Sequence, residues 1–401
     1  MLLGAHAASV VGDALLPVAL AFAVLDLTGS PSDLGLVLLS NLVPRIVFML
    51  AGGVWADRLP RQWLMVGSHF SRFATQGLQG VLLISGHASI LSLCVLQVLR
   101  GTGSAFFRPA ASGVLPSIVD REDLQSANAL MWMAASIGGI LGPALAGVLV
   151  ATVGPGWAIM GDAVSFLVAG TLLLGLKPKD VGVARSHPRF FADLAAGWHE
   201  VRSRTWVWAS ICHFSVFQLV YLSSLTVLGP LVAKRSLGGA PAWALIATGA
   251  GVGTLIGNMV ALRMRPSRPL VTAFSLTFAT IPSLVLLAVA APAPAIAATE
   301  IVAGAAIGLA SALWETTLQQ GVPAAALSRV SSYDWMGSIA LKPLGLALVG
   351  PLADAIGVRA TLLGAAALIA FITSVILTLP SIQRRTGGGS PTPVGGVAPA
   401  A

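Results

Sequence analysis

The feature that most constrains this chain is a series of long stretches that contain no Asp, Glu, Lys or Arg. A helix needs about 20 apolar residues to cross the hydrocarbon core of a membrane, and several of these stretches reach that length. Apolar residues make up 56% of the 401 residues and charged residues only 9%, whereas a soluble protein is about a quarter charged. The sequence therefore predicts an integral membrane protein. The uncharged stretches are 73–99, 124–161, 205–233, 236–262, 269–299 and 360–383.

Turn residues and charge clusters divide the chain into twelve candidate membrane spans. The segments between them are too short to fold as a soluble catalytic domain, so we expect the protein not to be an enzyme. The spans are expected at roughly 2–26, 34–56, 63–85, 89–111, 126–151, 157–176, 206–232, 241–262, 269–290, 295–318, 333–353 and 359–380.

Lys and Arg are distributed unevenly over the loops between these spans. Most of them fall on the side that carries both termini and the loop after the sixth span, while Lys234, Arg235 and Arg359 fall on the other side. Basic loops stay in the cytoplasm, so we expect a multi-pass protein of the cell (plasma) membrane with both termini cytoplasmic. The formal net charge of +8 is thus a topology signal, and we expect no nucleic-acid partner.

A short charged turn joins the second and third spans, and the apolar segments on either side leave room only for a tight hairpin. The spacing of Gly53, Asp57, Arg58 and Arg61 resembles the signature loop of the major facilitator superfamily of secondary transporters. The resemblance implies a gating latch, with the Asp57 carboxylate facing the positive N-terminal end of a helix in the other half. A purely topological role for these charges is the alternative. Pro60 departs from the family pattern, which has Gly there.

The resemblance implies an all-α integral membrane protein with the major facilitator fold, in which twelve transmembrane helices form two pseudo-symmetric six-helix bundles. We expect the first bundle over 1–176, a cytoplasmic linker with an amphipathic helix over 177–204, the second bundle over 205–380 and a disordered cytoplasmic tail over 381–401. Glu200 and Arg204 are spaced to pair on the linker helix. The halves also repeat a short pattern: Ser104-Ala105-Phe106-Phe107-Arg108 and Ser311-Ala312-Leu313-Trp314-Glu315 each precede a proline at the same distance.

The fifth span carries a run of small residues around a proline. Gly138, Gly142, Pro143 and Gly147 resemble the antiporter motif of the exporters in this superfamily, in which glycines let helices approach closely and the proline bends the axis. The resemblance implies export. Ordinary close packing of membrane helices is the alternative, because small residues every fourth position are common there.

Charged residues inside the expected spans are candidate functional positions, because a charge in hydrocarbon costs about 2.5 to 3.5 kcal/mol. Asp13 lies halfway along the first span, where burial favours the neutral acid, and is the leading candidate for proton coupling. Arg45 and Arg100 are candidates to restore its ionised form when the cavity changes shape. A permanent structural ion pair is the alternative. The charges within spans are Asp13, Arg45, Arg72, Arg100, Asp162, Glu300, Glu315 and Lys342.

Polar and aromatic residues of the second half are candidates for a substrate cavity. Glu315 beside Trp314 suits a cationic or amphipathic substrate, although pairing with cytoplasmic loop charges would also explain it. Three residues of the seventh span offer hydrogen bonds either to a ligand or to neighbouring helices. The candidate cavity residues are His213, Gln218, Tyr221, Trp314, Glu315 and Lys342.

Stretches over most of the chain, among them 108–128, 313–329 and 342–354, resemble the drug/proton antiporters that include macrolide and siderophore exporters. This implies export of a small amphipathic drug, antibiotic or secreted metabolite in exchange for protons, by a protein that contacts membrane lipids. We expect a monomer. A lipid or lysolipid translocator of the same fold and a non-transporting ligand sensor are the alternatives. The sequence contains no phosphate-loop or His-Glu-x-x-His pattern, so we expect no cofactor and no metal.

Overall fold

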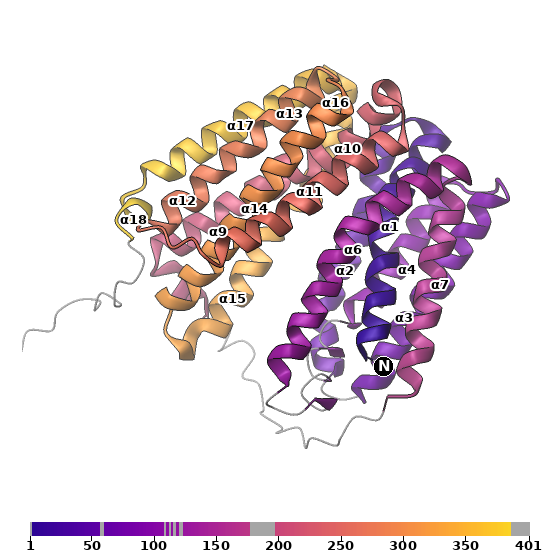
Figure 1. The fold of residues 1–401 in the computed structure, drawn as a ribbon, viewed down its shortest axis with the longest axis horizontal. Coiled ribbons are helices and arrows are strands. Elements are labelled where there is room, and N and C mark those ends of the chain that lie inside the picture. The colour runs from indigo at the N-terminus through magenta and orange to yellow at the C-terminus, as the bar shows by residue number, and fades with distance from the viewer. Residues whose placement is uncertain are drawn as a thin grey trace, which may run out of the picture.

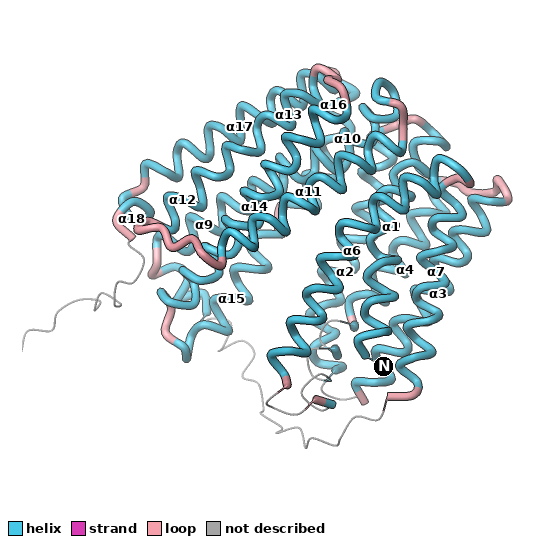
Figure 2. The backbone as a smooth tube through the Cα atoms, in the orientation of Figure 1, coloured by secondary structure: helices cyan, strands magenta, loops and turns pink. Residues whose placement is uncertain are grey.

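The computed structural model describes residues 2–56, 60–107, 110–111, 114, 118–119, 123–176 and 197–385. These residues form helices joined by short turns and contain no strand (Figure 2). The expected all-α fold class is confirmed. Asp57 and Arg58 of the expected gating loop lie outside the described residues, as do 177–196 of the linker and 386–401 of the tail.

The helices of the amino-terminal half begin and end at residues that favour helix termini. The side chain of Ser89 accepts a hydrogen bond from the backbone N–H of Ser92, whose hydroxyl in turn accepts from the backbone N–H of Ser89, and this capping box fixes the start of one helix. Two others begin at a proline, which lacks the N–H that would be unpaired there. The helices are α1 (Leu2–Thr28), α2 (Pro31–Ala56), α3 (Arg61–Ile84), α4 (Ile90–Ala105), α6 (Leu124–Thr152) and α7 (Pro155–Leu174).

In the carboxy-terminal half several spans consist of consecutive pieces. Pro282 and Pro343 stand at the start of such pieces, where a missing N–H breaks the regular hydrogen-bond ladder at low cost. The elements are α9 (Thr205–Phe217), η1 (Gln218–Leu222), α10 (Ser223–Val232), η2 (Ala233–Leu237), α11 (Ala240–Ala261), α12 (Pro269–Leu276), η3 (Thr277–Thr280), α13 (Ile281–Ala288), α14 (Ala293–Gly321), α15 (Ala324–Ile339), α16 (Lys342–Ile356), α17 (Val358–Thr378) and α18 (Pro380–Gln383).

When consecutive pieces are joined, the described helices reproduce the order of the twelve expected spans. Ten of them are long and apolar enough to cross a membrane. The other two are α4, whose described part is shorter, and α3, which is more polar because it buries His69, Arg72, Gln76 and Gln79. Polar groups inside a membrane protein are retained where they find partners away from lipid, so α3 is a span that contributes to an internal site.

The helices form two groups that diverge toward the end of the molecule carrying the N-terminus and meet toward the other end (Figure 1). Helix α6 of the first group lies against α11 of the second, and α2 lies against α16. Glycine makes the second contact possible, because a Cβ atom on Gly350 would lie 2.5 Å from the Cα of Ser32. The two groups therefore touch backbone to backbone at the closed end.

Polar contacts reinforce this closed end. The Lys234 ammonium donates to the Asp26 carboxylate and to the Leu25 carbonyl, both at 2.6 Å, and the Ser32 hydroxyl donates to the Asp354 carboxylate at 2.6 Å. Each contact joins one group to the other. We call the Lys234–Asp26 and Ser32–Asp354 pairs the outer clasp.

The structure can be compared with two expectations from the sequence, one for the linker and one for the tail. Residues 197–202 are helical, and the Arg204 guanidinium pairs with the Glu200 carboxylate as expected. The expected start of the tail at residue 381 differs from the structure, because Ile382 in α18 is fully buried and the Arg385 guanidinium lies 3.9 Å from the ring centroid of Trp206. Apolar packing thus holds the chain through residue 385.

Candidate functional site

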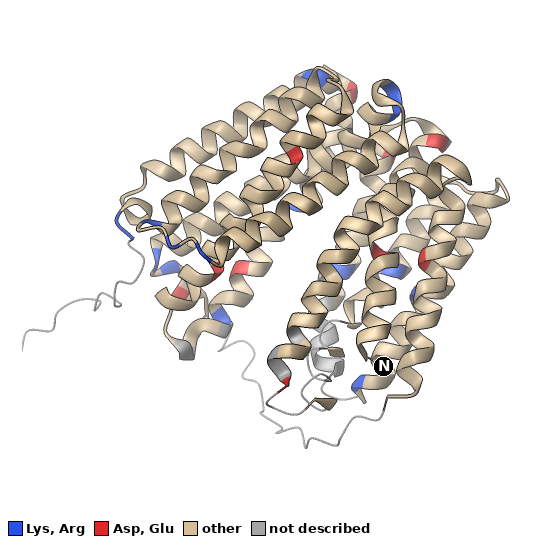
Figure 3. Cartoon of the chain, viewed as in Figure 1, with Lys and Arg blue, Asp and Glu red and all other residues tan. Residues whose placement is uncertain are grey.

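A cavity of about 740 Å³ opens within the amino-terminal group, between α1, α2, α3, α4 and α6, with one contribution from α10. Figure 3 shows charged residues coloured partway along helices of this group, where an apolar span would ordinarily have none. We call this space the amino-half cavity. Its polar lining comprises His6, Ser9, Asp13, Asn41, Arg45, Arg72, Gln97, Arg100, Ser104 and Thr226.

Asp13 of α1 is the acid on the wall of this cavity. Its carboxylate accepts a hydrogen bond from Arg100 of α4 at 2.6 Å and lies 3.4 Å from the guanidinium of Arg72 of α3. The side chain is 42% exposed, whereas those of the two arginines are almost fully buried. Asp13 is therefore both paired and open to the cavity, which is what a group that exchanges protons with water requires.

A second acid, Asp162 of α7, lies behind Arg100. It is completely buried, accepts a hydrogen bond from the Gln76 amide at 2.7 Å, and lies 3.9 Å from the same Arg100 nitrogen that contacts Asp13. Arg100 thus lies between an exposed and a buried carboxylate. Because the charges balance in pairs, the buried arrangement avoids an isolated charge, which would be far more costly.

Aromatic rings hold the other arginine in place. The Arg72 guanidinium lies 4.2 Å from the ring centroid of Phe166 and 5.0 Å from that of Phe107, and it also contacts His69 at 3.2 Å. Cation–π contacts of this kind gain strength when they are removed from water. The four charges Asp13, Arg72, Arg100 and Asp162, which we call the charge cluster, therefore come from four helices and occupy defined positions.

The structure extends the sequence interpretation of this site. Arg100 contacts Asp13, and Arg45 lines the same cavity. Arg72 and Asp162 are among the charges expected within spans, but the sequence did not indicate that Arg72 contacts Asp13 or that Asp162 contacts Arg100. The signal that could have found them is the presence of two acids and three bases among the candidate positions of the first six expected spans, since buried charges in membranes pair with one another.

The glycine-rich motif of α6 packs against α1 on either side of Asp13. A Cβ atom on Gly138 would lie 2.6 Å from the side chain of Val10, and one on Gly142 would lie 2.8 Å from the backbone of Ala14. Gly147 faces Ala244 of α11 in the other group, and Pro143 lies within α6 between these contacts. The motif residues thus let one helix approach both α1 and the second group closely.

The expected gating loop is only partly described. Gly53 lies in the last turn of α2, and Arg61 is the first residue of α3. Since Asp57 and Arg58 lie outside the described residues, the latch role of this loop stays a prediction.

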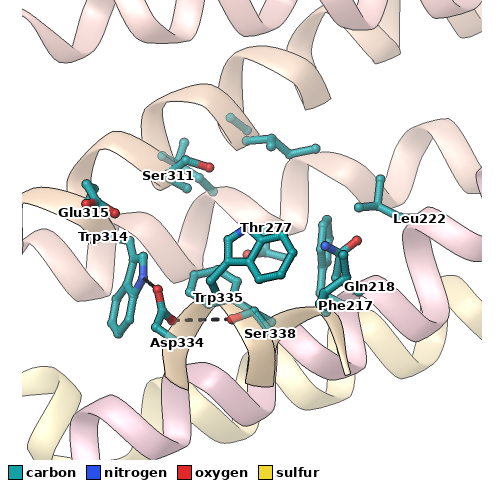
Figure 4. Close-up of a pocket in the computed structure, with 16 residues that line it drawn as sticks. Phe217, Gln218, Leu222, Thr277, Ser311, Trp314, Glu315, Asp334, Trp335 and Ser338 are labelled. Atoms are coloured by element: carbon teal, nitrogen blue, oxygen red, sulfur yellow. Dashed lines mark hydrogen bonds between the residues drawn. The ribbon is translucent and has the colours of Figure 1, made fainter. Parts of the chain in front are cut away.

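A second pocket, of about 310 Å³, lies in the carboxy-terminal group between α9, η1, α14 and α15 (Figure 4). Its walls are aromatic and include Phe214, Phe217, Trp314 and Trp335, and they carry two carboxylates. We call this space the carboxy-half pocket. The remaining lining residues are Gln218, Leu222, Leu276, Thr277, Ala306, Ile307, Ala310, Ser311, Glu315, Asp334, Ser338 and Ile339.

The two carboxylates of this pocket bond to neutral donors. The indole N–H of Trp314 donates to Asp334 at 3.0 Å, the Ser338 hydroxyl donates to the other oxygen of Asp334 at 3.4 Å, and the Gln319 amide donates to Glu315 at 3.0 Å. Within the described part of the chain, neither acid forms an ion pair with Lys or Arg. The pocket therefore presents two carboxyl groups that pair with no Lys or Arg among the described residues.

The structure separates the expected cavity residues of this half into two sets. Gln218, Trp314 and Glu315 line the carboxy-half pocket. His213 is buried against Phe274 and Thr373, and Tyr221 is completely buried. Asp334 and Trp335 were missed, because they fall at the edge of an expected span, where charged and aromatic residues are common.

The remaining cavity candidate, Lys342, is the first residue of α16 and is half-buried. It is not among the residues that line the amino-half cavity or the carboxy-half pocket.

Comparisons with known proteins agree with this architecture. The sequence profile of the Major Facilitator Superfamily matches residues 2–341. The chain is 27% identical over 389 residues to the multidrug efflux pump Tap of Mycolicibacterium fortuitum, covering 93% of each chain. It is 24% identical to macrolide efflux protein A of Streptococcus pyogenes, over 59% of this chain and 58% of the relative. Its fold resembles a bacterial homologue of the lysosomal transporter Spinster, with a TM-score of 0.70, 14% identity and coverage of 94% and 95%.

Proposed function

The chain belongs to the major facilitator superfamily of membrane transporters, and we propose that it exports small amphipathic drugs or antibiotics in exchange for protons. The observation that carries this proposal is the position of Asp13, which is open to the amino-half cavity while it contacts Arg100 and Arg72. Export is supported by relatives that are named as efflux pumps and by the close packing of α6 against α1 beside Asp13.

The charge cluster offers a physical reason for exchange. With both acids ionised, two carboxylates balance two guanidinium groups. When a proton binds Asp13, Arg100 keeps Asp162 as its acidic neighbour at 3.9 Å, and the cluster carries one net positive charge. A positive charge in a low-dielectric cavity repels a cationic substrate, so proton binding disfavours occupancy by the drug.

The carboxy-half pocket supports a substrate that combines an apolar body with a positive charge. Trp314, Trp335 and Phe217 supply aromatic surface, and Glu315 and Asp334 supply negative charge without a protein cation. Aromatic faces and carboxylates both attract organic cations.

The contacts between the two groups of helices support a proposal of alternating access. We propose that residues 1–176 and 205–380 act as two bundles that rock against each other, with the divergent end and both termini in the cytoplasm and a monomer in the plasma membrane as the working unit. The structure then represents an inward-facing state, in which the outer clasp closes the opposite end. Release of the drug outside requires the clasp to open.

Replacement of Asp13 by Asn tests this proposal. Cells that express the wild type should tolerate more erythromycin than control cells, and an uncoupler that discharges the proton gradient should remove this tolerance. Asp13→Asn should bind erythromycin but no longer couple its movement to protons. Unchanged drug-driven proton flux in Asp13→Asn would remove Asp13 from the mechanism, and tolerance that survives the uncoupler would refute proton exchange. Movement of labelled phospholipid without a proton requirement would favour a lipid translocator instead.

A further inference from the structure

Glu300 of α14 is a buried carboxyl group that lines neither the amino-half cavity nor the carboxy-half pocket. It is 2% exposed. The Tyr221 hydroxyl lies 3.2 and 3.4 Å from its two oxygens and donates to the carboxyl group, and the Ser283 hydroxyl lies 3.4 Å from that of Tyr221. Across the described residues, no Lys, Arg or His forms an ion pair with Glu300.

The surroundings of Glu300 supply no compensating charge. The elements packed near it are α11, α13 and η3, together with η1 through Tyr221, and Tyr221 is the only ionisable side chain in their sequences. An ionised carboxylate at this position would be a buried charge without a cation, which is strongly disfavoured in a membrane protein. The neutral acid, hydrogen-bonded to a hydroxyl, is therefore the stable form while this region remains closed.

Tyr221 belongs to η1, a single π-helical turn whose residues reach three different sites. Gln218 and Leu222 line the carboxy-half pocket (Figure 4). The backbone of Leu219 packs against Gly345 of α16, and Tyr221 contacts Glu300. Turns of this kind inside α-helices are frequent at functional sites. A change in the conformation of η1 would therefore alter its contacts with the carboxy-half pocket, with α16 and with Glu300 at the same time.

Helix α16 connects η1 to the closed end of the transporter. Gly345 packs on η1, while Gly350, further along the same helix, packs on Ser32 of α2 in the other group. Opening of the closed end separates α2 from α16. Because Gly345 leaves no space between α16 and η1, any displacement of α16 relative to η1 would change the packing of η1 and hence the position of Tyr221.

We propose that Glu300 is a second proton-binding site of the transport cycle, which takes up a proton from the outer side when opening of the outer end rearranges η1, and holds it while the outer end closes. This assignment rests on the proposed proton-coupled export. On uptake, a hydronium ion from the outer side transfers its proton to the carboxylate, so that an O–H bond forms and a water molecule remains. On release, the O–H bond breaks, the electron pair stays on the carboxylate, and the proton passes to water on the inner side when substrate in the carboxy-half pocket, which η1 also lines, displaces η1. The Tyr221 hydroxyl then no longer shields the group from water.

Transport by the purified full-length protein in proteoliposomes tests the assignment with erythromycin as the probe. Glu300→Gln keeps the shape and one hydrogen-bond acceptor of the neutral acid, so the fold is preserved. Accumulation driven by a pH gradient should fall at least about tenfold, whereas exchange of labelled for unlabelled erythromycin, which needs no net proton movement, should stay within about twofold of the wild type. A purely structural Glu300 would leave both rates intact or lower both together, and either result would overturn the proposal.

Infrared difference spectra of the same protein provide a readout that does not depend on transport. The wild type should show the carbonyl stretch of a protonated carboxyl group that disappears in Glu300→Gln and shifts in Tyr221→Phe. Tyr333→Phe, at the only other tyrosine of the chain, is the matched control and should leave the band in place. A band that Glu300→Gln does not change would refute the assignment. A wild type that exchanges erythromycin but ignores the pH gradient would refute the proton coupling itself, which separates the two failures.

Discussion

The amino-half cavity and the carboxy-half pocket occupy corresponding places in two repeated halves but have opposite chemistry. The repeated pattern places Ser104 and Phe107 on the cavity, and Ser311 and Trp314 on the pocket. Four residues before Ser104 stands Arg100, whereas the corresponding position before Ser311 is Ile307. The same framework thus carries a basic side chain on one side and an apolar one on the other.

The two sites also differ in how their acids are held. Asp13 and Asp162 of the charge cluster both lie beside Arg100, while Asp334 and Glu315 of the pocket bond to neutral groups. Paired charges are suited to the transfer of a proton, because protonation of the acid changes the net charge of the pair. Unpaired carboxylates are suited to attracting a cation from outside the protein. Under the proposed function, coupling and recognition would therefore occupy different halves of the molecule.

The largest expected effect comes from removing the shared cation of the amino half. Arg100→Met leaves Asp162 buried without its basic neighbour, and loss of one member of a buried pair costs about 3–5 kcal/mol in the free energy of unfolding. Thermal unfolding in detergent, followed by tryptophan fluorescence, measures the loss. Asp162→Asn introduced together with Arg100→Met should recover part of it, because the amide can still bond Gln76.

The matched control for this prediction lies in the other half. Lys342 forms no ion pair with a described acid, so Lys342→Met removes a cation of similar length without leaving a buried carboxylate behind. Its unfolding temperature should stay near that of the wild type. If Arg100→Met and Lys342→Met unfold at the same temperature, the charges of the two halves are held in the same way and the comparison fails.

The next effect concerns α6, which joins the two halves. Gly142→Ala places a Cβ atom 2.8 Å from the Ala14 backbone, so α1 and α6 must move apart beside Asp13. Overpacking of this kind costs about 1–3 kcal/mol. Gly139→Ala is the same substitution three residues away, where a Cβ atom meets nothing within 4 Å. The unfolding temperature should fall for Gly142→Ala but not for Gly139→Ala. Equal unfolding temperatures for the two variants would contradict the role of the close α1–α6 contact.

The sequence predicted the fold far better than it predicted the contacts within each site. Uncharged stretches and basic loops depend on local composition, and they gave the helix order, including the polar α3. Asp13 and Arg100 fall near the midpoints of the expected spans 2–26 and 89–111, so the sequence also predicted them at similar depth. Asp162 and Gln76 could not be paired in advance, because the rotation of each helix about its axis is set by packing, such as that of Gly170 against Phe70.

In the carboxy-terminal half, too, the sequence could not assign neighbouring residues to their separate sites. Gln218 and Tyr221 are close in sequence and were both expected on the cavity, yet the π-helical turn directs Gln218 to the pocket and Tyr221 to Glu300. A π-helical turn changes the direction of each following side chain. Nothing in the apolar sequence of η1 marks that irregularity, so the two roles could be separated only in three dimensions.

A smaller effect is expected on the affinity for an organic cation, and it distinguishes residues that recognise the substrate from residues that couple its transport to protons. Glu315→Gln and Asp334→Asn each remove negative charge from the carboxy-half pocket, and each should weaken binding of tetraphenylphosphonium, a permanent organic cation, about tenfold, or about 1.4 kcal/mol. Quenching of tryptophan fluorescence measures the affinity. Asp13→Asn carries the same net charge as the protonated acid, so it should weaken this binding less than either pocket variant does, while it removes the dependence of the affinity on pH and changes proton flux. If Asp13→Asn weakens binding as much as the two pocket variants do, recognition and coupling are not divided between the halves.

The smallest effect is expected at the outer clasp, which both halves share. Lys234→Ala removes an ion pair that is largely exposed, and exposed pairs contribute about 0.2–1 kcal/mol, so stability should hardly change. The conformational equilibrium should still shift, because the pair exists only while the outer end is closed.

Val37 is completely buried in α2, the helix that meets α16 at the closed end. A Val37→Cys protein without its native cysteines should therefore react about two- to fivefold faster with an impermeant maleimide when Lys234→Ala is present. Arg359→Ala removes a charge that forms no ion pair with the described residues and is the control. Equal labelling in the two variants would mean that the backbone contact between α2 and α16 closes the outer end without help from the clasp.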